Sequence, residues 1–157
     1  MDVRKATEAD IEAAVGLAER TRRQYQKYQP AFWRKASDSV AQTRSLFTKR
    51  LAEPGASFLV AVEGRQQLGF LIATKFSAPP AQAPSGDIYL IDDFCVAEPH
   101  LWLTIGEALL SHATTLLHEH GAAQIVVVCG DRDLPKAEML RRSDLTIASN
   151  WWTRPLG

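Results

Sequence analysis

One stretch of the sequence constrains the fold more than any other, because it is apolar on both faces and still carries two adjacent carboxylates. It reads Ile-Tyr-Leu-Ile-Asp-Asp-Phe-Cys-Val over residues 88–96. Alternate residues of a strand point to opposite faces, so both faces of this strand are apolar apart from Asp92 and Asp93. A strand of this kind is buried within a sheet that is covered on both sides. Residues 124–129 form a second run that is apolar on both faces, which is typical of a covered parallel strand.

Hydrophobic periodicity and turn residues predict the other elements. The expected order is β-α-α-β-β-β-α-β-α-β, an α/β domain with a mixed sheet. The second and third strands form an antiparallel hairpin, and the proline-containing residues 77–86 form a loop. Strands are expected at 3–6, 57–62, 68–76, 87–97, 124–129 and 145–153, and helices at 11–25, 38–51, 104–120 and 134–142.

Composition excludes several classes of function. The chain has 157 residues, the length of a single domain. It has 18 basic and 18 acidic residues, so neither nucleic acid nor an anionic membrane is expected as the main partner. The first twelve residues lack the apolar core of a signal peptide, and no apolar run reaches the ~18 residues of a membrane span. Cys95 and Cys129 are expected to be buried thiols in a reducing compartment. We therefore expect a soluble cytoplasmic protein.

No metal site is expected. His118 and His120 lie two positions apart on a predicted helix, where side chains point in nearly opposite directions and cannot share an ion.

The acid pair admits two interpretations. Burying a carboxylate costs several kcal/mol unless it is paired, hydrated or open to a cleft. Desolvation also raises a carboxyl pKa, which suits a general base acting on an ammonium substrate. The alternative is a structural carboxylate bonded to backbone amides or to an arginine. The sequence leaves both open for Asp92 and Asp93.

A helix start follows this strand within residues 96–107. The first amides of a helix have no intrahelical acceptor and lie at its positive end, which suits a phosphate group. Gly106 would allow a ligand or a neighbouring backbone to come close. The alternative is an ordinary helix start.

Together these features resemble the GCN5-related N-acetyltransferases. The resemblance rests on Tyr-Leu-Ile-Asp-Asp-Phe-Cys-Val at 89–96, the ten-residue gap to Gly106, and Gly-Glu-Ala-Leu-Leu at 106–110. It extends over nearly the whole chain and is nearest to members with a Leu-Glu-Asp-Phe-type fourth strand, which include polyamine acetyltransferases. It implies a single domain over residues 1–157 with a mixed, mostly antiparallel sheet flanked by helices. It also implies acetyl-CoA as cosubstrate and a primary amine, on a small molecule or peptide, as acceptor.

The resemblance also implies roles for individual residues. Asp92 would be the catalytic carboxylate, supported by Asp93. The backbone of Phe94, Cys95 and Val96 would hold the pantetheine arm, and Asp133 matches the asparagine of the family's Asn-x-Pro motif. Backbone amides would bind the pyrophosphate at Trp102, Leu103, Thr104, Ile105, Gly106 and Glu107. The acceptor pocket would be lined by Tyr25, Tyr28, Phe32 and Trp33, which could alternatively only pack the helices onto the sheet.

The sequence also departs from the family. Of the family's phosphate motif, Arg/Gln-x-x-Gly-x-Gly/Ala, only Gly106 remains. The tyrosine that commonly protonates the leaving thiolate is replaced by Leu140. These losses support an alternative, a non-catalytic acyl-CoA-binding or interaction protein on the same fold. Trp151 and Trp152 alternate on the expected last strand, so the outward one could contact a second copy in a homodimer.

Overall fold

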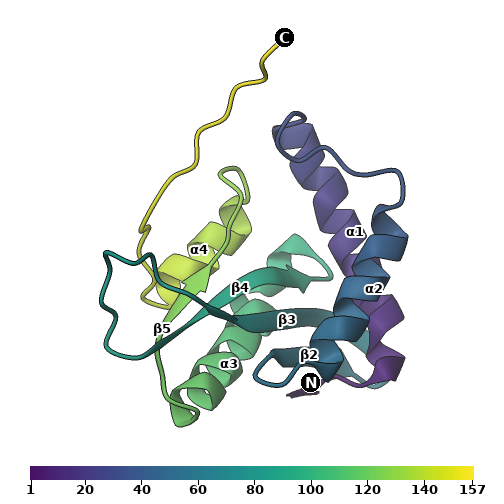
Figure 1. The fold of residues 1–157 in the computed structure, drawn as a ribbon. Coiled ribbons are helices and arrows are strands. Elements are labelled where there is room, and N and C mark those ends of the chain that lie inside the picture. The colour runs from purple at the N-terminus through teal and green to yellow at the C-terminus, as the bar shows by residue number, and fades with distance from the viewer.

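The computed structural model describes all 157 residues and contains one five-stranded sheet in the order β1-β2-β3-β4-β5 (Figure 1). The first four strands pair antiparallel, and β5 lies parallel to β4. This confirms the mixed, mostly antiparallel sheet. The strands are β1 (Asp2–Lys5), β2 (Ser57–Glu63), β3 (Gln66–Phe76), β4 (Asp87–Val96) and β5 (Ala122–Val127).

Four α-helices flank the sheet. Helices α1 and α2 cover one face and α3 covers the other, while α4 packs against the turn that precedes α3 (Figure 1). The helices are α1 (Ile11–Tyr28), α2 (Ser39–Ala52), α3 (Glu107–Glu119) and α4 (Leu134–Arg142), with short helical turns η1 (Glu8–Asp10), η2 (Pro99–Leu101) and η3 (Trp102–Gly106). None of them is long and apolar enough to cross a membrane.

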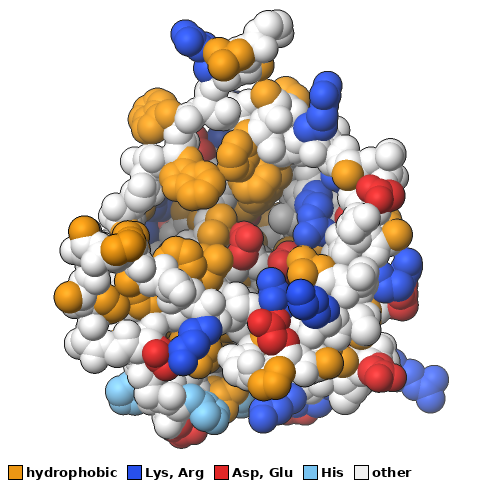
Figure 2. Space-filling model, in the orientation of Figure 1, with side chains coloured by type: hydrophobic (Ala, Val, Ile, Leu, Met, Phe, Trp, Pro, Cys, Tyr) orange, Lys and Arg blue, Asp and Glu red, His pale blue; other side chains and the backbone are white.

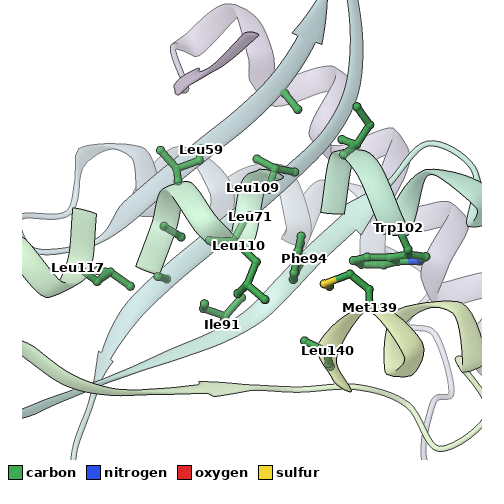
Figure 3. Close-up of a cluster of buried hydrophobic side chains, with 14 of the residues drawn as sticks. Leu59, Leu71, Ile91, Phe94, Trp102, Leu109, Leu110, Leu117, Met139 and Leu140 are labelled. Carbon is green, nitrogen blue, oxygen red and sulfur yellow. The ribbon is translucent and has the colours of Figure 1, made fainter. Parts of the chain in front are cut away.

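Alternation along the strands divides the core in two. Phe58 and Val60 of β2 pack with Phe47 of α2 on one face of the sheet. Leu59, between them, belongs to the cluster on the opposite face (Figure 3). That second cluster contains Ile91, Phe94, Trp102, Leu109, Leu110, Met139 and Leu140. Both faces of the sheet are therefore covered, as the doubly apolar strand predicts.

A β-bulge in β4 lies at the acid pair. Leu71 of β3 pairs with Phe94 and Ala73 pairs with Ile91, so Asp92 and Asp93 together oppose one residue of β3. The extra residue reverses the alternation of the strand beyond it. The two acids therefore do not follow the simple opposite-face rule expected from the sequence.

Beyond this bulge, β4 and β5 part. Their pairing ends with Ile91 opposite Val127 and a hydrogen bond from Val128 N to Ile91 O of 3.0 Å. Strand β4 continues to Val96 without a neighbour on that edge. The parted strands leave an open backbone edge next to the two carboxylates.

The predicted last strand at 145–153 is wrong. Residues 145–157 form neither helix nor strand, and the chain extends past the helices to a free end (Figure 1), with the ring centroid of Trp151 6.2 Å from that of Phe32. Asp144, at φ 63°, ends α4 in the left-handed conformation, and Leu145 N donates to Leu140 O. The segment then meets no sheet edge, and β-favouring side chains form a strand only when the backbone finds a partner. Strand β5 is consequently an edge strand.

Candidate active site

Of the two acids at the bulge, Asp93 is the desolvated one. Asp92 is exposed, which is one of the situations the sequence left open, whereas the side chain of Asp93 is only 24% exposed. Burial raises the pKa of Asp93 above its usual value, and the nearby carboxylate of Asp92 adds to this. The Arg22 guanidinium opposes the shift, with Nη2 at 3.3 Å from Asp93 Oδ1. Asp93 therefore combines the two alternatives of the sequence, because it is both desolvated and paired with an arginine.

Arg22 connects Asp93 to a second, fully buried carboxylate. Its Nη1 lies 3.4 Å from Glu19 Oε1. Glu19 also accepts hydrogen bonds from Lys35 Nζ at 2.7 Å and Ser39 Oγ at 2.8 Å. Although burial acts to raise the pKa of Glu19, these bonds and charges hold it below its usual range. Sequence analysis missed this cluster, although Glu19 follows Val15 by four residues and so lies on the apolar stripe of α1.

The four aromatic residues expected near the acceptor come together at the end of α1. The ring centroid of Tyr25 lies 5.1 Å from that of Trp33 and 6.0 Å from that of Tyr28, and Phe32 packs edge-on against Trp33. Tyr28 and Phe32 are exposed. Figure 2 shows that the gap between α1 and α4 is a hollow with apolar side chains on its rim and acidic groups on its floor.

Tyr25 also joins α1 to the loop after β5. It is buried, donates to Asp133 Oδ2 at 2.7 Å and accepts from Gly130 N at 3.1 Å. A Cβ atom at Gly130 would lie 2.8 Å from the Tyr25 ring, so this position requires glycine. Asp133 is the N-cap of α4 and accepts from Lys136 N at 3.4 Å. The carboxylate expected at the cofactor thus joins two helices.

The open edge of β4 has the geometry to hold an extended chain with amide groups. Ala97 N donates to Leu68 O on β3, so strand alternation turns the backbone of Cys95 towards β3 and the backbones of Phe94 and Val96 towards the open edge. Of the three residues expected to hold a pantetheine arm, two therefore present their backbone groups to the open edge of β4. Phe94 O already accepts a hydrogen bond from Lys136 Nζ at 3.2 Å.

Lys136 is a buried residue that sequence analysis missed. It is 3% exposed, and its Nζ lies 5.3 Å from the ring centroids of both Phe94 and Trp102. No local pattern identifies it, because a lysine in the first turn of a short helix is usually a solvated side chain. Only the packing of α4 against η3 encloses it.

The expected phosphate-binding turn is η3, which is wound as a π-helix. Leu103, Thr104 and Glu107 are exposed there, while Trp102, Ile105 and Gly106 are buried. A Cβ atom at Gly106 would lie 2.5 Å from a carbon of the Trp102 ring, so the close approach expected of a ligand is made by this ring. A depression of about 240 Å³ lies beside the turn, lined by Pro99, His100, Trp102, Leu103, Pro135 and Glu138.

The structure has a larger depression, and it lies apart from this site. This depression of about 560 Å³ lies between β1 and α3, and none of the candidate residues lines it. No group of three or more His, Cys, Asp or Glu side chains is arranged to hold a metal ion.

Comparison with known proteins identifies the fold. No protein-family model matches the sequence, and no curated protein matches it. Solved structures do match. The F44R mutant of the BH1408 protein from Bacillus halodurans has a TM-score of 0.85 at 18% identity, over 99% of both chains. A predicted acetyltransferase with acetyl-CoA from Clostridium acetobutylicum has a TM-score of 0.74 at 16% identity, over 98% of this chain and 95% of that one.

A third solved structure belongs to a protein whose family is known. A GCN5-related N-acetyltransferase from Ralstonia eutropha has a TM-score of 0.70 at 19% identity, over 99% of this chain and 97% of that one. The protein therefore has the fold of the GCN5-related N-acetyltransferases, as the β4 motif indicated.

Proposed function

We propose that the protein is an N-acetyltransferase that moves an acetyl group from acetyl-CoA to a primary amine. The observation that carries the proposal is Asp93, a desolvated carboxylate beside the point where β4 and β5 part. A carboxyl with a raised pKa is matched to taking a proton from an ammonium group near neutral pH. The fold is one that acetyltransferases share, and this supports the same reaction.

On the acceptor side, the amine enters through the hollow between α1 and α4. Asp93 accepts the proton of the ammonium group, and Arg22 orients that carboxylate. Asp92 is exposed beside it and adds a second negative charge. Aromatic faces near the entrance attract organic cations. This arrangement suits a small amine or peptide amine, and the adjacent carboxylates favour one with more than one positive charge, such as a polyamine.

On the donor side, acetyl-CoA supplies the activated acyl group. The backbone groups of Phe94 and Val96 on the open edge of β4 bind the pantetheine arm, and the Val96 amide polarises the thioester carbonyl. Exposed residues of η3 and the start of α3 bind the pyrophosphate at the positive end of the helix. Asp133 holds the loop that borders this site.

The test is incubation with acetyl-CoA and a panel of polyamines, lysine peptides and aminoglycosides, with free CoA measured by a thiol reagent. Thermal unfolding with CoA is measured in parallel, because a ligand at 100 times its Kd adds ~2.7 kcal/mol to stability. Amine-dependent CoA release supports the proposal. Stabilisation without turnover supports non-catalytic acyl-CoA binding instead. If the protein shows neither CoA release nor stabilisation by CoA, both functions are refuted.

We also propose that the protein acts as a homodimer in the cytoplasm. Trp151 and Trp152 are 83% and 92% exposed on the C-terminal segment, and β5 has a neighbouring strand on one side only. A second copy can supply a partner for both surfaces.

A further inference from the structure

Lys136 is a buried cation that has no anion beside it. It takes part in none of the ion pairs of the structure. An ammonium group has three donors, and the side-chain hydrogen bonds include one from Nζ, to Phe94 O. Lys136 also lies in the first turn of α4, at the positive end of a helix, where a cation is unfavourable.

The cost of this arrangement calls for a compensating function. Removing an unpaired charge from water is unfavourable, and the two aromatic rings beside Nζ recover only a part of that loss. A methionine or leucine would fill the same space without that cost. A lysine here therefore indicates a reaction or ligand that needs the charge.

Lys136 is also the proton donor near the parted strands that keeps donors free, because its ammonium group has three and the other two candidates each have one, already in use. The Cys129 thiol points to Gly130 O and Asp133 O, at 3.5 and 3.7 Å. The Tyr25 hydroxyl donates to Asp133. Lys136 contacts the backbone oxygen of Phe94, on the edge proposed for the pantetheine arm, and its charge lowers the pKa of Asp93 and of Cys129 against the effect of their burial.

We infer that Lys136 donates a proton to the sulfur that leaves in the transfer reaction, the step for which no tyrosine stands on α4. The inference rests on the proposed function. The amine nitrogen forms a bond to the acyl carbon, the carbon–sulfur bond breaks, and its electron pair stays on sulfur. Sulfur takes a proton from Lys136 Nζ, which regains one from water. Asp93 accepts the proton that the substrate ammonium loses, and the nitrogen releases its second proton to water.

The decisive variant is Lys136→Met, which keeps the length of the side chain and removes the charge, with the exposed Lys49→Met as the matched control. With acetyl-CoA, loss of a general acid is expected to lower kcat by ~10²–10⁴-fold with little change in KM. With an acetyl aryl thioester, whose thiolate leaves without protonation, the loss is expected to be under ~10-fold. Lys136→Met is expected to unfold at the same temperature as the wild type or higher, because it removes a buried unpaired charge.

A second measurement does not depend on turnover. The ultraviolet absorbance of thiolate reports the pKa of the CoA thiol in its complex with the protein. That pKa is expected to be lower in the wild type than in Lys136→Met, and Lys49→Met is expected to match the wild type.

Equal losses with both thioesters, or equal thiol pKa values in the two complexes, would overturn the inference. Weaker CoA binding with unchanged kcat would instead assign the charge to the pyrophosphate and overturn it too. If the wild type releases no CoA with any amine, the proposed function fails. The thiol pKa then still decides whether Lys136 acts on sulfur.

Discussion

Replacing Asp93 with asparagine separates catalysis from stability. The variant keeps the shape of the side chain but cannot accept the proton of the amine. A general base contributes ~10²–10⁴-fold to the rate, which corresponds to about 3–5 kcal/mol of transition-state stabilisation at ~1.4 kcal/mol per tenfold. We expect kcat to fall by this factor while CoA affinity stays unchanged.

Stability is expected to change in the opposite direction. The pKa of Asp93 is raised in the folded protein, so its contribution to stability is fully present below the unfolded pKa and is lost as the pH rises through the folded pKa. At neutral pH the ionised carboxylate therefore costs stability. The partly exposed contact with Arg22 returns no more than ~1 kcal/mol. Asp93→Asn should unfold at the same temperature or higher at neutral pH, and this gain should vanish in acid.

The assay is kcat/KM as a function of pH, combined with thermal unfolding at each pH. In the wild type the acidic limb should lie above the ordinary range of an aspartate, and it should be lost in Asp93→Asn. Asp92→Asn is the matched control, since Asp92 is exposed and should cost far less. Full activity in Asp93→Asn with an inactive Asp92→Asn would reassign the base to Asp92. Full activity in both variants would refute general-base catalysis by this pair.

Three further changes test other parts of the structure. Asp10→Asn should lower stability by up to ~1 kcal/mol near neutral pH, because asparagine keeps an oxygen for Thr7 N but loses the ion pair with Arg4. Hydrogen bonds from Arg4 lower the pKa of Asp10, so its stabilising effect is present above the unfolded pKa and lost as the pH falls through the folded pKa; a constant difference in acid would contradict this. Gly106→Val should cost ~1–3 kcal/mol in urea unfolding through overpacking against Trp102, and an unchanged midpoint would show that the ring moves aside. Trp151→Ser with Trp152→Ser should turn a dimer into a monomer in sedimentation and lower the unfolding temperature, because the stabilisation by association is lost; a wild-type monomer would refute the dimer.

The part of the fold that depends on local periodicity could be predicted. Phe58, Leu59 and Val60 alternate between two core clusters, as the apolar run at 57–62 requires. The apolar stripe of α1 is buried, and the doubly apolar β4 lies between covered faces. These patterns repeat every two or 3.6 residues, so a short window of sequence contains them.

The features that depend on distant contacts could not be predicted. The bulge at Asp92 and Asp93 is created by the pairing of β4 with β3. The sequence alone therefore could not tell which of the two acids is desolvated. The last strand was predicted from side chains that favour strands, but its backbone has no partner in the fold.

The sequence by itself determined the order of the elements as far as α4, the covered sheet and the motif that identifies the fold, because each depends on neighbouring residues. Tertiary structure alone decided the character of the site. Arg22 reaches Asp93 across 71 positions, and Lys136 reaches Phe94 across 42. Groups so far apart in the chain meet only when the folded elements pack together, and the desolvation that follows gives the site its chemistry.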